Sequence, residues 1–299
     1  MAGFGDIRFS GAKHAPVLFG IDVTGSMTTP VKVKDGKKTR MDMANDMIRQ
    51  FFEHILSIYK AADAVEVAFV LFTHEIVMET EFVNIMHLSD AVFEKAKKTK
   101  DCGEWELYPV TVGIKDSTKS RTGNVPRFEV CKNDEGTKID SAVLYCYEKL
   151  LNVRNQYIKD SKEFYAPHFV LVTDGDPDKG HGSQRDDEKT HQNAVDKAFD
   201  HCWTGRDGKN LIVPITVGIL GEEVDAEAEK RLRDYSENFR SGYFHVRENF
   251  AVKDFNKAAE FLCKTLVKSL ILSAHNLEEL SDEDSEEDRG ANVEEIYGE

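Results

Sequence analysis

The sequence has no apolar run long enough to span a membrane, and its first residues contain no apolar stretch of signal-peptide length. Cysteine is scarce and odd in number, with five residues and no C-x-x-C pair. Free thiols in a reducing compartment are the simplest interpretation of that usage. These absences predict a cytoplasmic protein that neither crosses nor binds a membrane.

Phosphate-binding glycine motifs are also absent. The chain contains neither G-x-x-x-x-G-K-[ST] nor G-x-G-x-x-G, so no nucleotide site of those kinds is predicted. Basic residues are in the minority, and the 299-residue chain has a formal net charge of −15. An acidic surface repels a phosphate backbone, so we expect no nucleic-acid partner.

The negative charge is concentrated at the end of the sequence. Residues 276–299 contain eleven acidic residues and one basic residue, whereas the other 275 residues carry 43 acidic and 38 basic ones. Such an acidic segment cannot bury enough apolar surface to fold, so we predict a disordered tail at 276–299. Residues 1–275 are apolar enough for a sizeable core and are predicted to form one domain.

The chain is rich in alternating strand-like and helical segments. Continuous β-branched and aromatic runs predict strands at residues 16–22, 65–72, 168–172, 211–218 and 243–246. Apolar residues at spacings of three and four, or amphipathic composition, predict helices at residues 41–58, 139–150, 186–203, 226–236 and 255–270. Residues 82–98 indicate a strand-to-helix piece. Several strands are apolar on both faces, which predicts an α/β fold with a mostly parallel central sheet and helices on both faces.

Residues 101–136 depart from this alternation. They hold four glycines, two prolines and two short strand-like pieces, at 108–114 and 127–131. We interpret them as an excursion from the sheet in the form of a hairpin. Trp105 and Tyr108 in this excursion fit either anchors for a partner or satellite core packing.

Three connections that lead into helices carry small oxygen donors. The first contains Asp22, Thr24 and Ser26, the second contains Thr137, and the third contains Asp174. Ligands bind beyond the carboxyl ends of parallel strands, so we expect these residues to lie together. Carboxylate and hydroxyl oxygens suit hard cations such as Mg²⁺, and two carboxylates roughly neutralise a divalent ion.

Each connection also has a simpler interpretation. Ser26 fits a helix cap, Thr137 followed by Asp140 fits a capping box, and Asp174 followed by glycine fits an ordinary turn. The three connections together favour a metal site. Thr137 is compatible with both roles.

These loops resemble the metal-ion-dependent adhesion site of von Willebrand factor A (vWA) domains. Asp22-Val23-Thr24-Gly25-Ser26 is similar to the family's D-x-S-x-S motif, residues 136–142 to its threonine loop, and residues 170–175 to its aspartate loop. The resemblance implies a Rossmann-like, three-layer vWA fold over residues 1–275, of the cytoplasmic single-domain type found in the TerY-like group. Thr24 departs from the family pattern, which usually has serine there.

The resemblance also implies a function. Mg²⁺ or Mn²⁺ would be bound by the hydroxyls of Ser26 and Thr24, by Thr137 directly or through water, and by Asp22 and Asp174 mainly through water. A protein partner would supply a carboxylate to the open coordination position. The chain would then be a binding module, a scaffold or adaptor, and not an enzyme.

Aspartyl-phosphate enzymes offer an alternative. The stretch from Asp22 to Ser26 also resembles their D-K-T-G-T motif, and residues 173–178 loosely resemble their G-D-G-x-x-D loop. Asp22 would then be the nucleophile of a Mg²⁺-dependent phosphatase or phosphotransferase, with the metal held by Asp174 and Asp178. Val23 replaces the usual lysine, and Thr137 has no role in that scheme, so we favour the binding module.

Basic residues follow the first motif. Lys32, Lys34, Lys37, Lys38 and Arg40 lie in one polar loop, which fits either a solvated loop or a surface that attracts an acidic partner. A carboxylate of the acidic tail is a further candidate for the open metal position. The sequence itself names no particular partner and no oligomeric state.

Overall fold

The structure, a computed structural model, describes residues 14–33, 36–99, 103–115, 117–131, 136–165, 167–174 and 212–219. The helices and strands predicted at 186–203, 226–236, 243–246 and 255–270, and the tail at 276–299, lie outside the described residues. The strands are β1 (Ala15–Asp22), β2 (Pro30–Val33), β3 (Gly36–Thr39), β4 (Val65–Phe72), β5 (Ile76–Glu79), β6 (Val83–Asn84), β7 (Lys97–Lys98), β8 (Trp105–Gly113), β9 (Ser120–Phe128), β10 (His168–Thr173) and β11 (Val213–Gly218). The helices are α1 (Arg40–Ser57), α2 (Tyr59–Ala64), α3 (Asp90–Glu94) and α4 (Ile139–Lys159), with 3₁₀ turns η2 (Gly25–Thr28) and η3 (Ile85–His87).

The main sheet has the strand order β11-β10-β1-β4-β5-β7, and β6 also pairs with β4. Its pairs β1–β4, β1–β10 and β10–β11 are parallel. Its pairs β4–β5, β4–β6 and β5–β7 are antiparallel. The described sheet is therefore mixed, and the prediction of a mostly parallel, Rossmann-like vWA sheet is wrong.

A short connection explains the antiparallel part of the sheet. β4 ends at Phe72 and β5 begins at Ile76, and the amide of Thr73 donates to the carbonyl of Glu75 at 2.9 Å within the turn between them. A turn this tight reverses the chain, because a parallel crossover needs about a dozen residues or more. β5 was not predicted, and residues 82–98, predicted as one strand-to-helix piece, contain β6, η3, α3 and β7.

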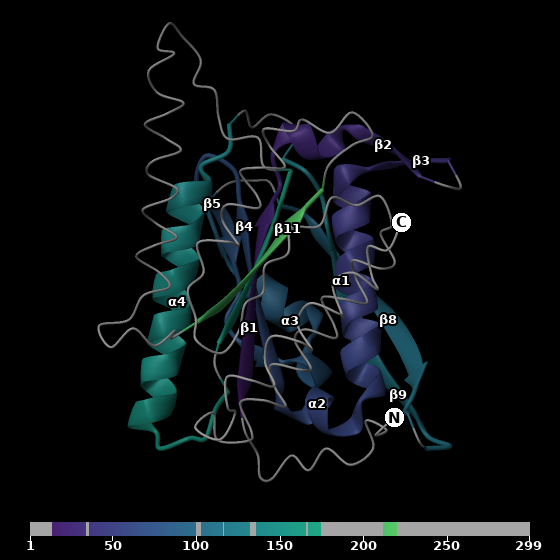
Figure 1. Cartoon of the computed structure of the whole chain (residues 1–299), viewed down its shortest axis with the longest axis vertical. Helices are drawn as coiled ribbons and strands as arrows, with labels where there is room; N and C mark the ends of the chain where they lie inside the picture. Colours follow the sequence, from purple (N-terminus) through teal and green to yellow (C-terminus); the bar gives the residue numbers. More distant parts are fainter. Residues whose placement is uncertain are drawn as a thin grey trace, which may run out of the picture.

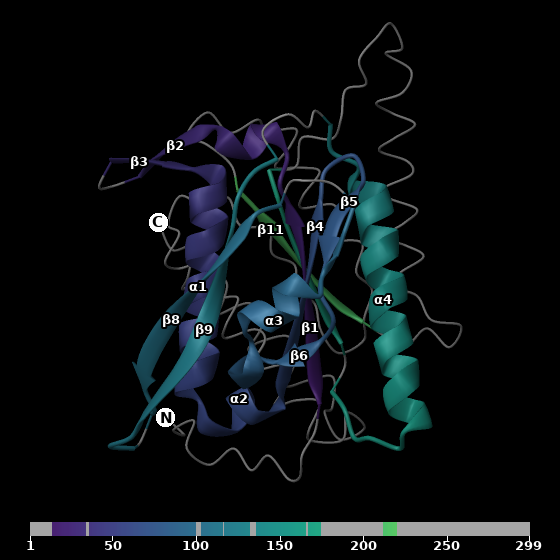
Figure 2. The ribbon, with the colours of Figure 1, turned by 180° about the vertical axis from the view of Figure 1, so that it is seen from behind.

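Helices cover both faces of the sheet, with α1 on one side and α4 on the other (Figures 1 and 2). Successive side chains of β1 point to opposite faces, as they do in any strand. Phe19 packs in the core cluster of α1, where its ring meets the ring of Phe51 edge to face at 5.3 Å. Leu18 packs instead in the cluster that contains Cys146 of α4. The two clusters fix β1 between the helices.

The predicted hairpin is confirmed, but its second strand, predicted at 127–131, is β9 at Ser120–Phe128. β8 and β9 pair in antiparallel register from Trp105 opposite Phe128 to Gly113 opposite Ser120, and they form a separate two-stranded sheet. Asn45 of α1 attaches this hairpin to the core, because its side chain donates to the Phe128 carbonyl and accepts from the Phe128 amide, both at 2.9 Å.

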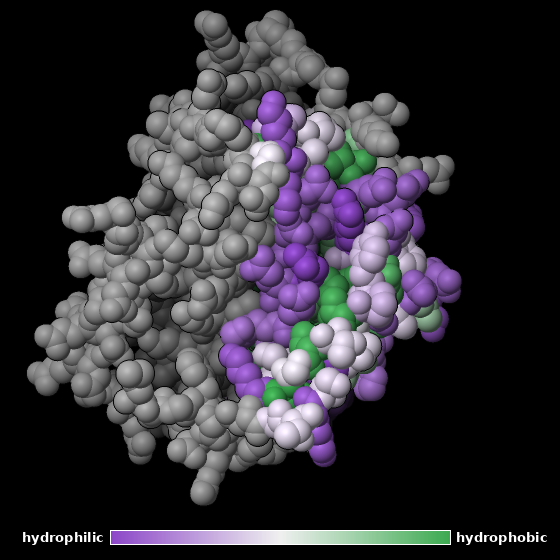
Figure 3. All heavy atoms as spheres, turned by 90° about the vertical axis from the view of Figure 1, so that its right-hand side faces the viewer, coloured by the Kyte–Doolittle hydropathy of each residue, from purple (hydrophilic) through white to green (hydrophobic). Residues whose placement is uncertain are grey.

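The two aromatic side chains singled out in the hairpin differ in their surroundings. The ring of Trp105 stacks on Phe93 with centroids 4.7 Å apart, so it packs against the core, whereas Tyr108 is 42% exposed. Seen from the side of α1 and the hairpin, the described surface is mostly hydrophilic with a narrow hydrophobic strip (Figure 3). That part of the surface offers no broad apolar area for docking.

Cysteine usage differs from the prediction. Cys131 is disulfide-bonded, whereas Cys146 is a buried thiol. The prediction of free thiols is therefore wrong for Cys131, and the cysteines do not support a reducing compartment. No helix within the described ranges is long and apolar enough to cross a membrane.

Candidate metal site at the end of the central strands

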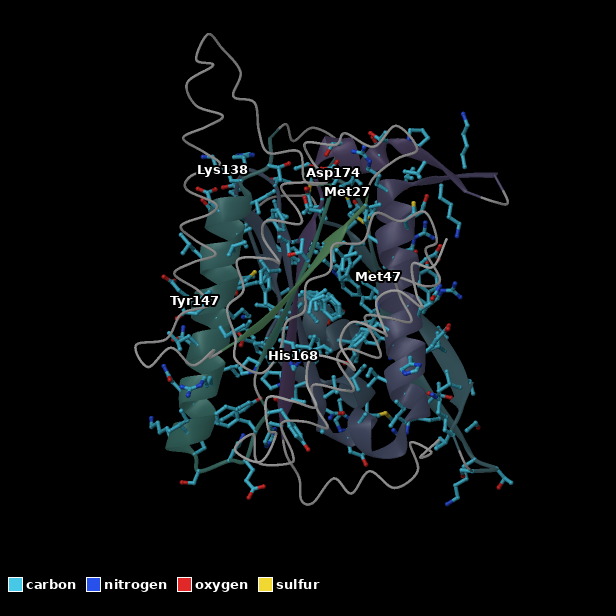
Figure 4. The ribbon with its side chains drawn as sticks, in the orientation of Figure 1. Met27, Met47, Lys138, Tyr147, His168 and Asp174 are labelled. Carbon is cyan, nitrogen blue, oxygen red and sulfur yellow. The ribbon has the colours of Figure 1, made fainter. Side chains whose placement is uncertain are left out.

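The five predicted site residues gather at the carboxyl ends of β1 and β10. The parallel register of the two strands pairs Ile21 with Val172, which places Asp22 next to Thr173 and one residue from Asp174. Figure 4 shows Asp174 at the same end of the sheet as Met27, which follows the first motif, and Lys138, which follows Thr137. The three connections therefore converge, as the sequence analysis expected.

The first loop is organised by hydrogen bonds to Asp22. The amide and the hydroxyl of Thr24 both donate to Oδ1 of Asp22, at 2.9 and 2.6 Å. Oγ1 of Thr24 also lies 2.9 Å from Oγ of Ser26. The turn η2 begins after Thr24 and has no side-chain cap, so the simpler interpretation of Ser26 as a cap finds no support.

Thr137 reaches this loop from the start of α4. Its hydroxyl donates to Oγ1 of Thr24 at 3.4 Å, and the residue is only 3% exposed. The amide of the next residue, Lys138, donates to the carbonyl of Thr73 at 3.0 Å and holds the connection against the end of β4. Lys138, and not Thr137, is the N-cap of α4, and its side chain makes no cap hydrogen bond.

Asp174 is buried and has a cationic partner. Nη1 of Arg40, the first residue of α1, lies 2.6 Å from Oδ2 of Asp174. Thr173, the residue before Asp174, donates its hydroxyl to Oδ2 of Asp22 at 2.8 Å. Sequence reasoning assigned Thr173 no role and placed Arg40 only among the basic residues. The T-D-G sequence was the available signal for Thr173, and no local signal pointed to the Arg40 contact.

Electrostatics at the site favour a cation. The pKa of Asp22 is raised from 3.8 to about 7, chiefly by burial and also by the nearby charge of Asp174, against the lowering effect of the hydrogen bonds from Thr24 and Thr173. Asp22 is 0% exposed and Asp174 is 2% exposed. Two carboxylates withdrawn from water repel one another, so a positive charge placed between them lowers the free energy of the ionised site.

The donor set is one of oxygens only. Within the described residues no group of three or more His, Cys, Asp or Glu is placed to hold a metal. A cation at this end of the sheet would therefore take part of its coordination from hydroxyls. Two carboxylates and the hydroxyls of Thr24, Ser26 and Thr137 form the kind of hard oxygen set that Mg²⁺ or Mn²⁺ accepts. The residues present fit such an ion.

A basic hairpin borders the site. β2 and β3 pair between Pro30 and Thr39, and Lys37 and Lys38 are exposed on β3. Lys38 forms an ion pair with Asp46 of α1. The hairpin ends at Thr39, immediately before Arg40, so its positive charges lie next in the chain to the residue that contacts Asp174.

Comparisons with known proteins yield little. No protein-family model and no curated protein matches the sequence. Among solved structures, a PilB minor pilin from Streptococcus sanguinis is similar with a TM-score of 0.45 and 14% identity, over 89% of this chain and 63% of that one. An uncharacterized membrane spanning protein from Vibrio fischeri is similar with a TM-score of 0.24 and 12% identity, over 86% of this chain and 99% of that one. Both TM-scores lie below 0.5, so neither likeness establishes a fold or a function.

Proposed function

We propose that this site binds a divalent cation, Mg²⁺ or Mn²⁺, and that the bound ion accepts a carboxylate from a protein partner. The observation that carries the proposal is the convergence of three hydroxyls and two buried carboxylates from three separate connections. Burial of Asp22 near Asp174 is unfavourable when both are ionised, and Arg40 pairs with Asp174 only, so a divalent ion would offset negative charge beside Asp22. The likeness to the vWA adhesion site rests on the three motifs alone.

The contacts suggest which residues would bind the ion directly and which would orient those residues. Oδ1 of Asp22 accepts a hydrogen bond from Thr24, and Oδ2 accepts one from Thr173. We therefore expect Asp22 to affect a bound ion mainly through the groups that it orients, and not by direct coordination. Thr24, Ser26 and Thr137 present their hydroxyls to one another and are the candidates for direct contact. A bound divalent ion would supply a Lewis-acidic position for one anionic oxygen from outside.

The aspartyl-phosphate alternative receives no support from these contacts. A nucleophilic carboxylate needs an oxygen that can reach the substrate. Asp22 is 0% exposed, and both of its oxygens accept hydrogen bonds from threonines. Asp178, the other residue that this alternative needs, lies outside the described residues. We therefore propose that nothing is turned over at this site.

Calorimetric titration of the full chain with Mn²⁺ and with Mg²⁺ tests the proposal. We expect saturable binding to the wild type, weakened at least about tenfold by Ser26→Ala and by Thr24→Ala, since each removes one oxygen ligand. Thr111→Ala is the matched control, because Thr111 and Thr122 form a similar hydroxyl pair at 2.9 Å in the hairpin. A wild type that binds neither ion, or site variants that bind like the control, would overturn the proposal.

The partner is tested separately. Affinity capture is carried out with the wild type and with the double variant Asp22→Ala plus Ser26→Ala, each with and without a chelator. A metal-bridged partner is lost both on chelation and in the double variant. Partners that are still captured after chelation and by the double variant would show that binding does not depend on the metal.

Cytoplasmic location remains a prediction, and fractionation of the source cells is its direct measurement.

A further inference from the structure

Arg40 places a resident positive charge in the proposed metal site. Its Nη1 lies 2.6 Å from Oδ2 of Asp174, and the two side chains are 19% and 0% exposed. Together with Asp22, the site contains two carboxylates and one guanidinium. The guanidinium therefore offsets part of the negative charge of these two carboxylates.

The backbone of Arg40 is firmly held. Its amide donates to the carbonyl of Thr29 at 3.1 Å. The preceding residue, Thr39, forms a capping box with Asp42, in which the Asp42 amide donates to Oγ1 of Thr39 at 3.0 Å. Because the start of α1 is fixed in this way, only the side chain of Arg40 is free to leave Asp174.

The ion pair is incompletely satisfied on the arginine side. Nε of Arg40 is buried and has no hydrogen-bond partner among the described residues. Arginine binds a carboxylate best when two of its N–H groups donate in parallel, and a buried donor without an acceptor weakens the arrangement. The contact with Asp174 therefore holds the guanidinium without using its full hydrogen-bonding capacity.

We propose that Arg40 is the counter-charge of the metal-free site, which pairs with Asp174 until a divalent ion enters and then gives up or shares that carboxylate. This inference rests on the proposed function. Two cations compete for one buried carboxylate, so the guanidinium lowers the affinity of the site for metal. Arg40 thus sets the metal concentration at which the site fills, and with it the concentration at which a carboxylate partner can bind.

The chain offers a matched control for this experiment. Arg127 also pairs with an aspartate near the start of α1, since its Nη2 lies 2.8 Å from Oδ1 of Asp42. Its side chain is 51% exposed, and its ion pair is with Asp42 and not with Asp22 or Asp174. Arg127→Gln removes the same charge from the same region while leaving the site residues unchanged.

Titration of the full-length variants with Mn²⁺ tests the inference. We expect Arg40→Gln to lower the Kd at least about tenfold, because a repelling charge beside the ion is removed. Arg40→Lys keeps the positive charge and should stay within about threefold of the wild type, and Arg127→Gln should not differ from the wild type. Equal Kd values for Arg40→Gln and the wild type would overturn the inference while leaving the metal site standing. No binding by any variant would overturn the site itself.

Thermal unfolding gives a second readout that does not need a partner. In chelator, Arg40→Gln should unfold at a lower temperature than the wild type, and Mg²⁺ should raise its Tm more than it raises the wild-type Tm. A variant that folds only with Mg²⁺ supports the inference. If Arg40→Gln folds in neither condition, ¹⁵N-arginine spectra of the wild type test the inference instead. The Nε signal of Arg40 is assigned as the one that is absent from the spectrum of Arg40→Lys. An Arg40 signal that does not shift at saturating Mg²⁺ overturns the inference.

Discussion

Oγ1 of Thr24 and Oγ1 of Thr137 lie 3.4 Å apart, although 113 residues separate them in the chain. One residue follows the central strand β1 and the other precedes α4. The apolar cluster between β1 and α4, which includes Leu18 and Ile139, sets the distance between these two elements. The geometry of the site therefore depends on core packing as well as on the site residues.

Gly20 is a position where that packing leaves no room for a side chain. A Cβ at Gly20 would lie 2.9 Å from Cε2 of Phe169 and 3.4 Å from Sγ of Cys146, both buried. We expect Gly20→Ala to lower the free energy of unfolding by about 1–3 kcal/mol, the usual effect of overpacking. Urea denaturation measures it. Gly113→Ala is the control, since no atom lies within 4 Å of a Cβ there. Equal stabilities of the two variants would contradict the prediction.

Thr39 stabilises the start of α1. Its hydroxyl accepts from the amide of Asp42 at 3.0 Å and completes a capping box. Thr39→Ala should lower the free energy of unfolding by about 1 kcal/mol, and Thr39→Ser should retain most of it. Ser89 is the N-cap of α3 and makes no side-chain cap hydrogen bond, so Ser89→Ala should have a smaller effect. Chemical denaturation at one pH compares the three variants, and a larger loss for Ser89→Ala would count against this account.

The buried Asp22 predicts a pH dependence of stability. Its pKa is about 7 in the fold and near 3.8 when it is exposed, so between these values the folded chain binds a proton that the unfolded chain has released. The contribution of Asp22 to stability is therefore fully present below pH 3.8 and is lost as the pH rises through about 7. Metal-free unfolding at several pH values measures this slope. Asp22→Asn carries no titrating group there and should reduce the decline, and parallel curves for both proteins would refute the assignment.

Glu79 links β5 to two lysines of different exposure. Nζ of Lys97 lies 2.8 Å from one carboxylate oxygen and Nζ of Lys149 lies 3.0 Å from the other. Lys97 is 76% exposed, whereas Lys149 is 13% exposed, so only the second contact is shielded from water. Lys149→Met should lower the free energy of unfolding by about 1–2 kcal/mol, since it leaves a buried carboxylate oxygen with one fewer donor. Lys97→Met should cost less. The order of the two urea midpoints checks the prediction, which an inverted order would refute.

Those parts of the fold that depend on local pattern could be predicted from the sequence. β4 occupies residues 65–72 as expected, because its continuous apolar run is buried on both faces. α1 begins one residue before the predicted helix, at Arg40, because Thr39 caps it. β5 was missed because its four residues follow a tight turn and carry no periodic signal of their own. That omission is the reason the sheet was predicted to be mostly parallel.

The candidate site also has a part that the sequence could indicate and a part that it could not. Asp22, Thr24, Ser26, Thr137 and Asp174 could be proposed from the sequence because each follows or precedes a recognisable element. The contact of Arg40 with Asp174 spans 134 residues and brings the start of α1 to the end of β10, which no local pattern encodes. The disulfide state of Cys131 was missed for the same reason, since spacing alone does not show which thiols meet.

The position of Asp22 at the end of β1 has a mechanical consequence. β1 pairs in parallel with β4 on one side and with β10 on the other. Tension applied at Asp22 along the strand would load both ladders in shear, so that many hydrogen bonds must break together before the strand slides out. A load applied there would be borne by a strand that is paired on both sides.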